Sequence, residues 1–307
     1  MKLLSLLNSY LGNLIRSPLD FHKSIEDIKT ALGRIESRQL SKAVQEINTT
    51  EFKVFSQWGE DGIIQFLVNK IEIPNKIFIE FGVENYTESN TRFLLQNNNW
   101  SGLIFDGSRD NINYIKNDPI YWRYNLKAEC AFIDRENINR LISNNGISGD
   151  IGILSIDIDG NDYWVWEAIN CVTPCIVICE YNSIFGPHAK ITIPYDKDFK
   201  RSNAHYSNLY YGASIAALAT LANRKGYSLI GSNSAGNNIF FVRNELIRDM
   251  KTYAPEESYV KSQFRESRDN RGTLSFLDFD QRLELIENLE VYDIQTEAKI
   301  KIKDIKK

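Results

Sequence analysis

The chain has little of what metal-binding and nucleic-acid-binding proteins usually need. Its 307 residues include three histidines and four cysteines, and no two cysteines form a CxxC pair. Cys171, Cys175 and Cys179 flank or occupy one predicted buried strand, so we interpret them as small apolar side chains rather than metal ligands. This cysteine usage predicts a reducing, cytoplasmic location. An excess of positive charge is also missing, because the net charge is −4, which argues against general nucleic-acid binding.

Long apolar runs are absent as well. Polar side chains interrupt residues 1–19, so we expect neither a transmembrane segment nor a cleaved signal peptide there. The apolar residues of this stretch recur at helical spacing, at Leu3, Leu4, Leu7, Leu11, Leu14 and Ile15. The pattern predicts an amphipathic helix that packs on the domain or on a partner subunit, with peripheral membrane contact as the alternative.

A second helix is predicted over residues 24–47. It carries a heptad-like seam of Ile25, Ile28, Leu32 and Ile35. We therefore expect residues 1–50 to form a helical arm, which is a candidate for homodimerisation.

From residue 51 onward, strands alternate with helices. Apolar runs predict strands at 76–81, 102–105, 128–133, 151–158 and 176–179, with helices at 61–70, 89–97, 111–115, 136–143, 163–169, 213–225 and 281–289. The alternation predicts an α/β fold with a mainly parallel, Rossmann-like sheet. A turn signal at 236–238 predicts a closing antiparallel hairpin. We expect one domain over 51–245 and a charged, partly helical extension over 246–307.

The first two strands of this sheet end in residues that suit a cofactor. Glu80 and Gly82 open a turn where backbone can approach a ligand, and the helix near Ser89 offers free amides. The further glycines of a nucleotide loop are missing, which counts against a nicotinamide or nucleoside-triphosphate site. Asp106 and Ser108 end the next strand, at a spacing that suits an acid for ribose hydroxyls. Capping of the following helix by Asp106 or Ser108 is the alternative.

Acids also end two later strands. Asp157, Asp159 and Asp162 follow one strand, and Glu180 and Asn182 follow the next. The carboxyl ends of parallel strands share one edge of an open α/β sheet, where such sheets place their chemistry. Because burying clustered acids without a partner is costly, we expect solvent, a cation or a cationic ligand to satisfy them.

Four of these segments together resemble the FkbM-type group of class I methyltransferases. They are Ser56-Gln-Trp-Gly-Glu-Asp-Gly62, Glu80-Phe-Gly82, Asp106-Gly-Ser108 and Ile156-Asp-Ile-Asp-Gly-Asn-Asp162, within residues 54–243. Members use S-adenosylmethionine, and many methylate sugar hydroxyls. The resemblance implies that Glu80 and Gly82 face the methionine part of the cofactor and that Asp106 faces its ribose. We count Ser89, Ser108 and Asp157 as further cofactor contacts. The second glycine of the family's cofactor turn is missing here.

The segment Asp157-Ile-Asp-Gly-Asn-Asp-Tyr163 is also similar to cation-dependent catechol- and caffeoyl-type O-methyltransferases. That resemblance implies Mg²⁺ or another divalent cation on Asp157, Glu180 and Asn182, although Tyr181 interrupts the acid–amide pair. Oxygen ligands suit such cations, which can hold a hydroxyl and lower its pKa. The alternative is that Asp159 and Asp162 cap the next helix while Glu180 binds substrate directly.

Residues after the last acidic strand complete the predicted site. His188 is a candidate base or metal ligand, and with Asp157 and Asp159 it forms the predicted catalytic set. His205 lies in a long loop at 193–211, which we expect to cover the site. An aromatic, mildly basic strip could bind sugar rings or a phosphate, or serve only packing: Tyr195, Arg201, Tyr206, Tyr210 and Tyr211.

The sequence thus predicts an S-adenosylmethionine-dependent O-methyltransferase. Its expected substrate is a hydroxyl of a sugar, a nucleotide-sugar or a bacterial surface polysaccharide such as capsule or O-antigen. Two alternatives use the same acids. One is a metal-dependent hydrolase or phosphotransferase acting on a glycan precursor, and the other is a non-catalytic sugar-binding or assembly protein.

Overall fold

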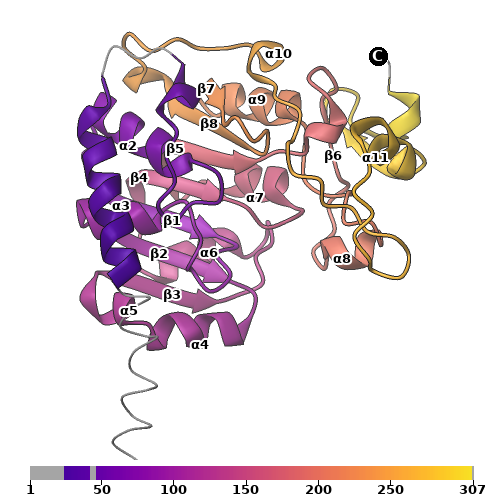
Figure 1. Cartoon of the computed structure of the whole chain (residues 1–307). Coiled ribbons are helices and arrows are strands. Elements are labelled where there is room, and N and C mark those ends of the chain that lie inside the picture. Colours follow the sequence, from indigo (N-terminus) through magenta and orange to yellow (C-terminus); the bar gives the residue numbers. More distant parts are fainter. Residues whose placement is uncertain (1–23, 42–45, 306–307) are drawn as a thin grey trace, which may run out of the picture.

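The computed structural model describes residues 24–41 and 46–305, with a seven-stranded sheet at the centre (Figure 1). Its strands are β1 (Ile77–Phe81), β2 (Ser101–Asp106), β3 (Leu126–Cys130), β4 (Gly149–Ile156), β5 (Val172–Glu180), β7 (Tyr227–Ser232) and β8 (Asn238–Arg243). Their order is β3-β2-β1-β4-β5-β8-β7. The first five strands pair in parallel, and β8 pairs antiparallel with both β5 and β7. The predicted Rossmann-like sheet with a closing hairpin is confirmed.

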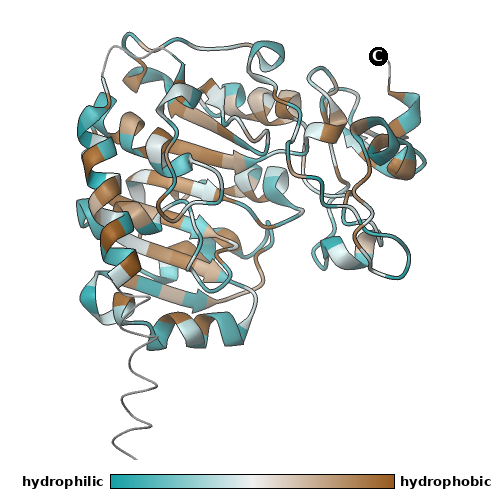
Figure 2. Ribbon diagram, viewed as in Figure 1, coloured by the Kyte–Doolittle hydropathy of each residue, from teal (hydrophilic) through white to brown (hydrophobic). Residues whose placement is uncertain are grey.

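Helices cover both faces of this sheet, because side chains on both sides of its central strands are apolar (Figure 2). Leu154 of β4 packs into one core and its neighbour Ile153 into the other. The first core includes α6 (Ile138–Asn144), α7 (Asp162–Ala168) and α9 (Ile215–Arg224). The second includes α2 (Glu60–Lys70), α3 (Arg92–Asn98), α4 (Arg109–Asn117) and α5 (Pro119–Arg123).

A smaller lobe lies beside the main sheet (Figure 1). It contains a second sheet in the order β10-β9-β6, built from β6 (Ile191–Thr192), β9 (Glu290–Asp293) and β10 (Ala298–Lys301). With it belong α8 (Arg201–Ala204) and α11 (Phe279–Ile286), while α10 (Pro255–Ser258) lies along the connection. Its separate apolar core includes Ile191, Ile286 and Val291. The C-terminal extension therefore pairs with the segment that follows β5.

Several predicted elements differ from the observed ones. The helix expected over 24–47 ends at residue 39. The strand expected at 128–133 is β3, which begins and ends earlier, at Leu126–Cys130. Neither α5 nor the strands β9 and β10 were predicted. The amphipathic helix predicted for residues 1–19 lies outside the described residues. Within residues 24–41 and 46–305, no helix combines the length and apolarity that crossing a membrane requires.

The motif at residues 56–62 has a structural role. Both oxygens of the Asp61 side chain are buried, and Oδ2 accepts hydrogen bonds from the backbone of Val54, Phe55 and Ser56 at 2.7–2.8 Å. Burial raises the pKa of Asp61 to about 6. A Cβ on Gly62 would lie 2.0 Å from the Thr50 carbonyl oxygen, so the chain crosses itself closely here. These contacts tie residues 50–56 to the start of α2.

Candidate functional site

A cavity of about 450 Å³ lies along the carboxyl ends of β1, β2, β4 and β5. The ends of β1 and β4 adjoin there, at the point where the strand order changes direction. Open α/β sheets bind ligands at this switch point, and the volume suits a small molecule. The small lobe contributes Phe199, Arg201 and Glu266 to the lining. The cavity is therefore shared by the sheet edge and the small lobe.

Glu80 borders the cavity and holds the turn after β1. Its carboxylate accepts hydrogen bonds from the backbone of Asn90 at 2.8 Å, from the backbone of Thr91 at 3.1 Å, and from the Thr91 hydroxyl. Burial raises the pKa of Glu80 to about 7. Both of its oxygens thus fix the start of α3, a structural role that the sequence did not reveal.

Gly82 joins the two sides of the cavity. Its φ of +68° lies in the region that favours glycine, and a Cβ there would sit 1.7 Å from the backbone oxygen of Asp157. No side chain fits between these two strand ends. The turn after β1 therefore lies directly against the first residue of the acidic loop.

Asp106 and Ser108 have different roles. Asp106 lines the cavity, and the two hydrogen bonds that its side chain accepts from the described residues, from Ser108 N at 2.7 Å and Asn111 Nδ2 at 3.0 Å, both end on Oδ1. Oδ2 is therefore left for a ligand hydroxyl. Ser108 lies outside the lining and caps α4 by accepting a hydrogen bond from Asn111 N. The capping alternative is correct for Ser108, whereas Ser89 lines the cavity as expected for a cofactor contact.

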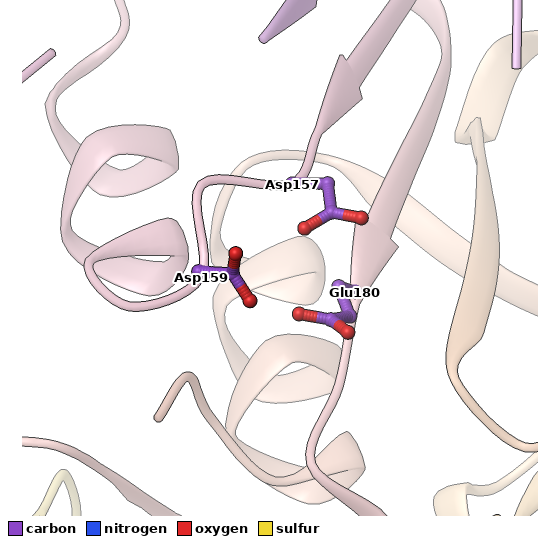
Figure 3. Close-up of side chains that lie close together, drawn as sticks. All are labelled: Asp157, Asp159 and Glu180. Carbon is purple, nitrogen blue, oxygen red and sulfur yellow. The ribbon is translucent and has the colours of Figure 1, made fainter. Parts of the chain in front are cut away.

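Three carboxylates converge on the other side of the cavity (Figure 3). Oxygens of Asp157, Asp159 and Glu180 lie within 4.8 Å of one another. Glu180 is 7% exposed, and its Oε2 has no hydrogen-bond partner among the described residues. The buried Oδ1 atoms of Asn161 and Asn238, which line the same cavity, are likewise unpartnered within the described chain. This side presents oxygen acceptors that a ligand would satisfy.

Proximity changes how these acids ionise. Burial, followed by repulsion from Asp159 and Asp162, raises the pKa of Asp157 well above its usual range. Burial and repulsion from Asp157 do the same to the pKa of Glu180. A carboxyl group with a raised pKa can both hold and accept a proton near neutral pH. A bound cation would instead favour the ionised form of both groups.

Asp162 shapes the loop that carries the first two acids. Its Oδ1 accepts a hydrogen bond from Ile158 N and its Oδ2 one from Gly160 N, both at 2.9 Å. The N-cap of α7 is Asn161, so the alternative in which Asp159 caps this helix is wrong. Asp159 instead adopts φ +54° and directs its carboxylate toward Arg201. Asp162 is therefore structural, and Asp159 faces the site.

Asn182 does not join the acid cluster, in contrast to its predicted role as a metal ligand. Its Oδ1 accepts a hydrogen bond from Ile184 N, and its Nδ2 donates to the carbonyls of Leu209 at 2.9 Å and Tyr211 at 3.1 Å. It is buried outside the cavity lining. The structure places Asp159, and not Asn182, beside Asp157 and Glu180.

The long loop does cover the site, through Phe199 and Arg201. A Cβ on Gly160 would lie 2.3 Å from the Phe199 ring, so the acidic loop and the covering loop are in close contact. Arg201 pairs with Asp159, donates to the Asn208 carbonyl at 2.7 Å and stacks on the Tyr211 ring at 3.8 Å. Three protein groups therefore hold the guanidinium at the edge of the cavity.

The remaining members of the predicted strip do not line the cavity. The Tyr195 hydroxyl donates to Glu136, the Tyr210 hydroxyl to the Glu290 carbonyl, and Tyr211 packs under Arg201. Tyr206 is exposed and stacks on His205, with ring centroids 4.3 Å apart. Packing is thus the better interpretation for these tyrosines. Their spacing in the sequence could not distinguish a packed tyrosine from a sugar-binding one.

Neither predicted histidine reaches the cavity. His188 is exposed, and its Nδ1 lies 3.3 Å from Glu256 Oε1. His205 contacts the Ser207 hydroxyl at 2.7 Å, and burial lowers its pKa. The catalytic role predicted for His188 therefore has no geometric support. The acids supply the groups that titrate within the site.

The lining residues that the sequence analysis missed include Phe132, Asn161, Phe199 and Asn238. Phe132 follows β3 at the same sheet edge and is 46% exposed, so the strand order alone could have identified it. Asn161 lies inside the acidic loop. Asn238 pairs with Glu180 across β5 and β8, which required knowledge of the antiparallel register.

No family model matches the sequence, and no curated protein is similar to it in sequence. Similar solved structures include the N-terminal domain of EvdMO1 with SAH bound (10% identity, 54% of this chain and 73% of that chain, TM-score 0.35). An S-adenosylmethionine-dependent methyltransferase from Clostridium acetobutylicum is also similar (10% identity, 54% of this chain and 83% of that chain, TM-score 0.34). A third is an O-methyltransferase family protein from Burkholderia thailandensis (12% identity, 60% of this chain and 57% of that chain, TM-score 0.37).

Proposed function

We propose that this chain is an S-adenosylmethionine-dependent methyltransferase that methylates a hydroxyl group. The observation that carries the proposal is the shared cavity. It places Asp106 and the Gly82 turn directly beside the acid cluster of Asp157, Asp159 and Glu180. One side suits an adenosine-type cofactor, and the other suits an acceptor that must lose a proton.

The charge of the cavity supports a cationic cofactor. Within the described chain, its lining carries one guanidinium, Arg201, and eight carboxylates, namely Glu80, Glu84, Glu88, Asp106, Asp157, Asp159, Glu180 and Glu266. A sulfonium and an ammonium group are favoured by such a lining. Asp106 Oδ2 would accept from ribose hydroxyls, and Phe132 would contact the purine ring. The residues present therefore fit S-adenosylmethionine.

When bound, S-adenosylmethionine supplies an electrophilic methyl group on its sulfonium sulfur. The chain would hold the acceptor hydroxyl among Asp157, Asp159 and Glu180. Glu180 or Asp157 would accept the proton that this hydroxyl loses on methylation. The raised pKa of both carboxyl groups suits that transfer. Alignment of the two reactants supplies the rest of the rate.

The acid cluster also fits a divalent cation. Three carboxylates and one guanidinium give the cluster a formal charge of −2 (−3 + 1), and Glu180 Oε2 lacks a partner in the described chain. We propose Asp157, Asp159 and Glu180 as ligands of Mg²⁺ or a similar ion, which suits all-oxygen donors. In the presence of EDTA, methyl transfer should then fall, and added Mg²⁺ should restore it. Undiminished turnover in EDTA would remove the metal from the proposal.

We propose a sugar, free or within a glycan, as the acceptor. Polar side chains line the acceptor side, and Phe199 offers an aromatic face for a ring. Arg201 is held by Asp159, Asn208 and Tyr211, so no unengaged cation is at hand for a phosphate. The acidic lining thus favours an uncharged sugar over a nucleotide-sugar. The sequence motifs also predict membership of the FkbM-type group and a role in surface polysaccharide synthesis, and both stay predictions.

Calorimetry with S-adenosylmethionine tests the proposal. We expect binding in the micromolar range, weakened about tenfold or more in Asp106→Ala, because ribose hydroxyls lose their acceptor. Asp110→Ala, an exposed acid in the first turn of α4, is the matched control and should bind like wild type. Absence of binding to the wild-type chain would favour the hydrolase or sugar-binding alternatives. Mass spectrometry of candidate sugars should then detect the gain of one methyl group.

A further inference from the structure

The helix at residues 24–39 packs on the domain through small and polar residues. Thr30 and Gly33 are buried, and Glu26 pairs with Arg92 of α3 at 3.0 Å. A Cβ on Gly33 would lie 2.5 Å from Val54 Cγ2, so this face has no room for a larger side chain. In Figure 1 the helix runs along the outside of the molecule, next to α3. Its inward face is thus not its apolar face.

The large apolar side chains of this helix point outward instead. The exposed fractions are 38% for Ile25, 59% for Ile28, 56% for Leu32 and 49% for Ile35. Their spacing of three, four and three residues places them on one stripe of a helix. Figure 2 shows apolar bands along this helix. A surface helix normally turns such a stripe toward the core, and an exposed apolar stripe marks an interaction site.

We propose that this stripe, residues 25, 28, 32 and 35, joins two copies of the chain through an antiparallel helix pair. The spacing of three, four and three residues reads the same in both directions. An antiparallel pair therefore sets Ile25 opposite Ile35 of the second copy, and Ile28 opposite Leu32 of the second copy. Every apolar layer is filled, and a twofold axis through the middle of the stripe closes the assembly.

Charge favours the same arrangement. Lys29 and Glu36 are exposed beside the stripe, Lys29 one residue before its midpoint and Glu36 one residue past its end. Reversing the second helix places Lys29 of each copy between Lys29 and Glu36 of the other, so two of the three charge contacts on this side are complementary. A parallel pair sets like ends together and forms neither. The six charged residues of the helix sum to zero, whereas helices that bind membrane surfaces are usually basic on the polar face.

Light scattering on the full-length chain tests the pairing. At micromolar concentration we expect twice the 35.4 kDa of one chain. The double variant Ile28→Asp/Leu32→Asp should halve that mass. Phe276→Asp is the matched control, since Phe276 is 53% exposed just before α11 in the small lobe, which lies on the opposite side of the molecule from this helix (Figure 1), and it should keep the doubled mass. A wild-type mass of one chain would overturn the proposal, as would a doubled mass that the double variant retains.

Cross-linking tests the orientation, in a Cys130→Ser background that removes the exposed native thiol. Ala31→Cys lies next to the twofold axis, so a short dithiol-reactive cross-linker should join two chains. Ile25→Cys should not react in this way, because ten residues of helix, about 15 Å, separate the two copies of this position. Efficient cross-linking through Ile25→Cys would replace the antiparallel pair by a parallel one. Vesicle binding lost in the double variant, with a monomer in solution, would identify a membrane contact instead. None of these results depends on cofactor binding, so they test the pairing separately from the proposed function.

Discussion

On the β1 side of the cavity, Glu80 accepts three hydrogen bonds from the turn that follows its own strand. On the β5 side, Glu180 is as deeply buried, yet its Oε2 accepts none within the described chain. Both residues are acids at the end of an apolar strand. The sequence presents them alike, and the structure assigns one to the backbone and the other to the cavity.

The same division runs through the acidic loop. Both oxygens of Asp162 accept hydrogen bonds from the amides of Ile158 and Gly160, while the carboxylates of Asp157 and Asp159 point toward Glu180. A buried carboxylate without donors costs free energy unless a ligand compensates it. Glu80 and Asp162, which fix turns, therefore have donors on both oxygens, whereas Asp157 and Glu180 accept no side-chain hydrogen bond from the described residues. Substitutions at the two kinds of acid should have opposite effects on stability and activity.

The largest expected effect is on activity at Asp157. Asp157→Ala should lower kcat/KM for methyl transfer by about 1000-fold, because it removes a group that would hold the acceptor or a cation. The melting temperature should stay within a few degrees of wild type, since the residue also repels Asp159 and Glu180. A methyl-transfer assay and thermal unfolding measure the two quantities. Wild-type-like turnover in this variant would disprove the assigned centre.

Asp162→Ala should show the reverse emphasis, with a loss of stability. It leaves the amides of Ile158 and Gly160 without their charged acceptor, at a cost of about 3 kcal/mol. For a chain of this size, that lowers the melting temperature by about 5 °C. Asp162→Asn keeps one acceptor oxygen, so its melting temperature should lie between those of wild type and Asp162→Ala. If Asp162→Ala unfolds at the wild-type temperature, the distinction between structural and cavity-facing acids fails.

The sequence identified most of the fold because its signals are local. Apolar runs of strand length and their alternation with helices were enough for β1 to β5 and for the β7–β8 hairpin. The second sheet escaped because β6 has two residues and because β9 and β10 are short and largely polar. Pairing between segments about a hundred residues apart leaves no periodic signal in such strands.

Prediction of the site was limited by side-chain direction. Strand ends located Glu80, Asp106, Asp157 and Glu180 at the correct edge, because parallel strands share that edge. Which of these acids face the cavity depends on donors from the turns, and those turns were not predictable from residue types. Asn182 and His188 follow the same strand end as Glu180, but the chain turns away after Tyr181 and removes both from the cavity.

A smaller effect concerns the pH dependence of stability at Glu180. Its folded-state pKa is raised by burial and by Asp157, above the 4.5 expected for the unfolded chain. The contribution of Glu180 to the stability of the fold is therefore greatest below about pH 4.5, and it is lost as the pH rises through the raised pKa. Glu180→Gln should remove this loss, stabilising the chain at pH 8 by about 1 kcal/mol and not at pH 4. Thermal unfolding at both pH values, with EDTA present, measures the difference. A gain that is equal at both would show that ionisation of Glu180 is not its cause.

The smallest expected effect is at His188, the residue that the sequence placed in the catalytic set. Its ring is exposed and pairs only with the similarly exposed Glu256, and such surface pairs contribute about 0–1 kcal/mol. His188→Ala should therefore change kcat/KM by less than about twofold, whereas removal of a general base costs about 100-fold or more. Glu256→Ala is the matched control, because it breaks the same pair from the other side. A loss in His188→Ala that Glu256→Ala does not share would mean that the histidine moves into the cavity when substrate binds. The chemistry would then extend beyond the three acids.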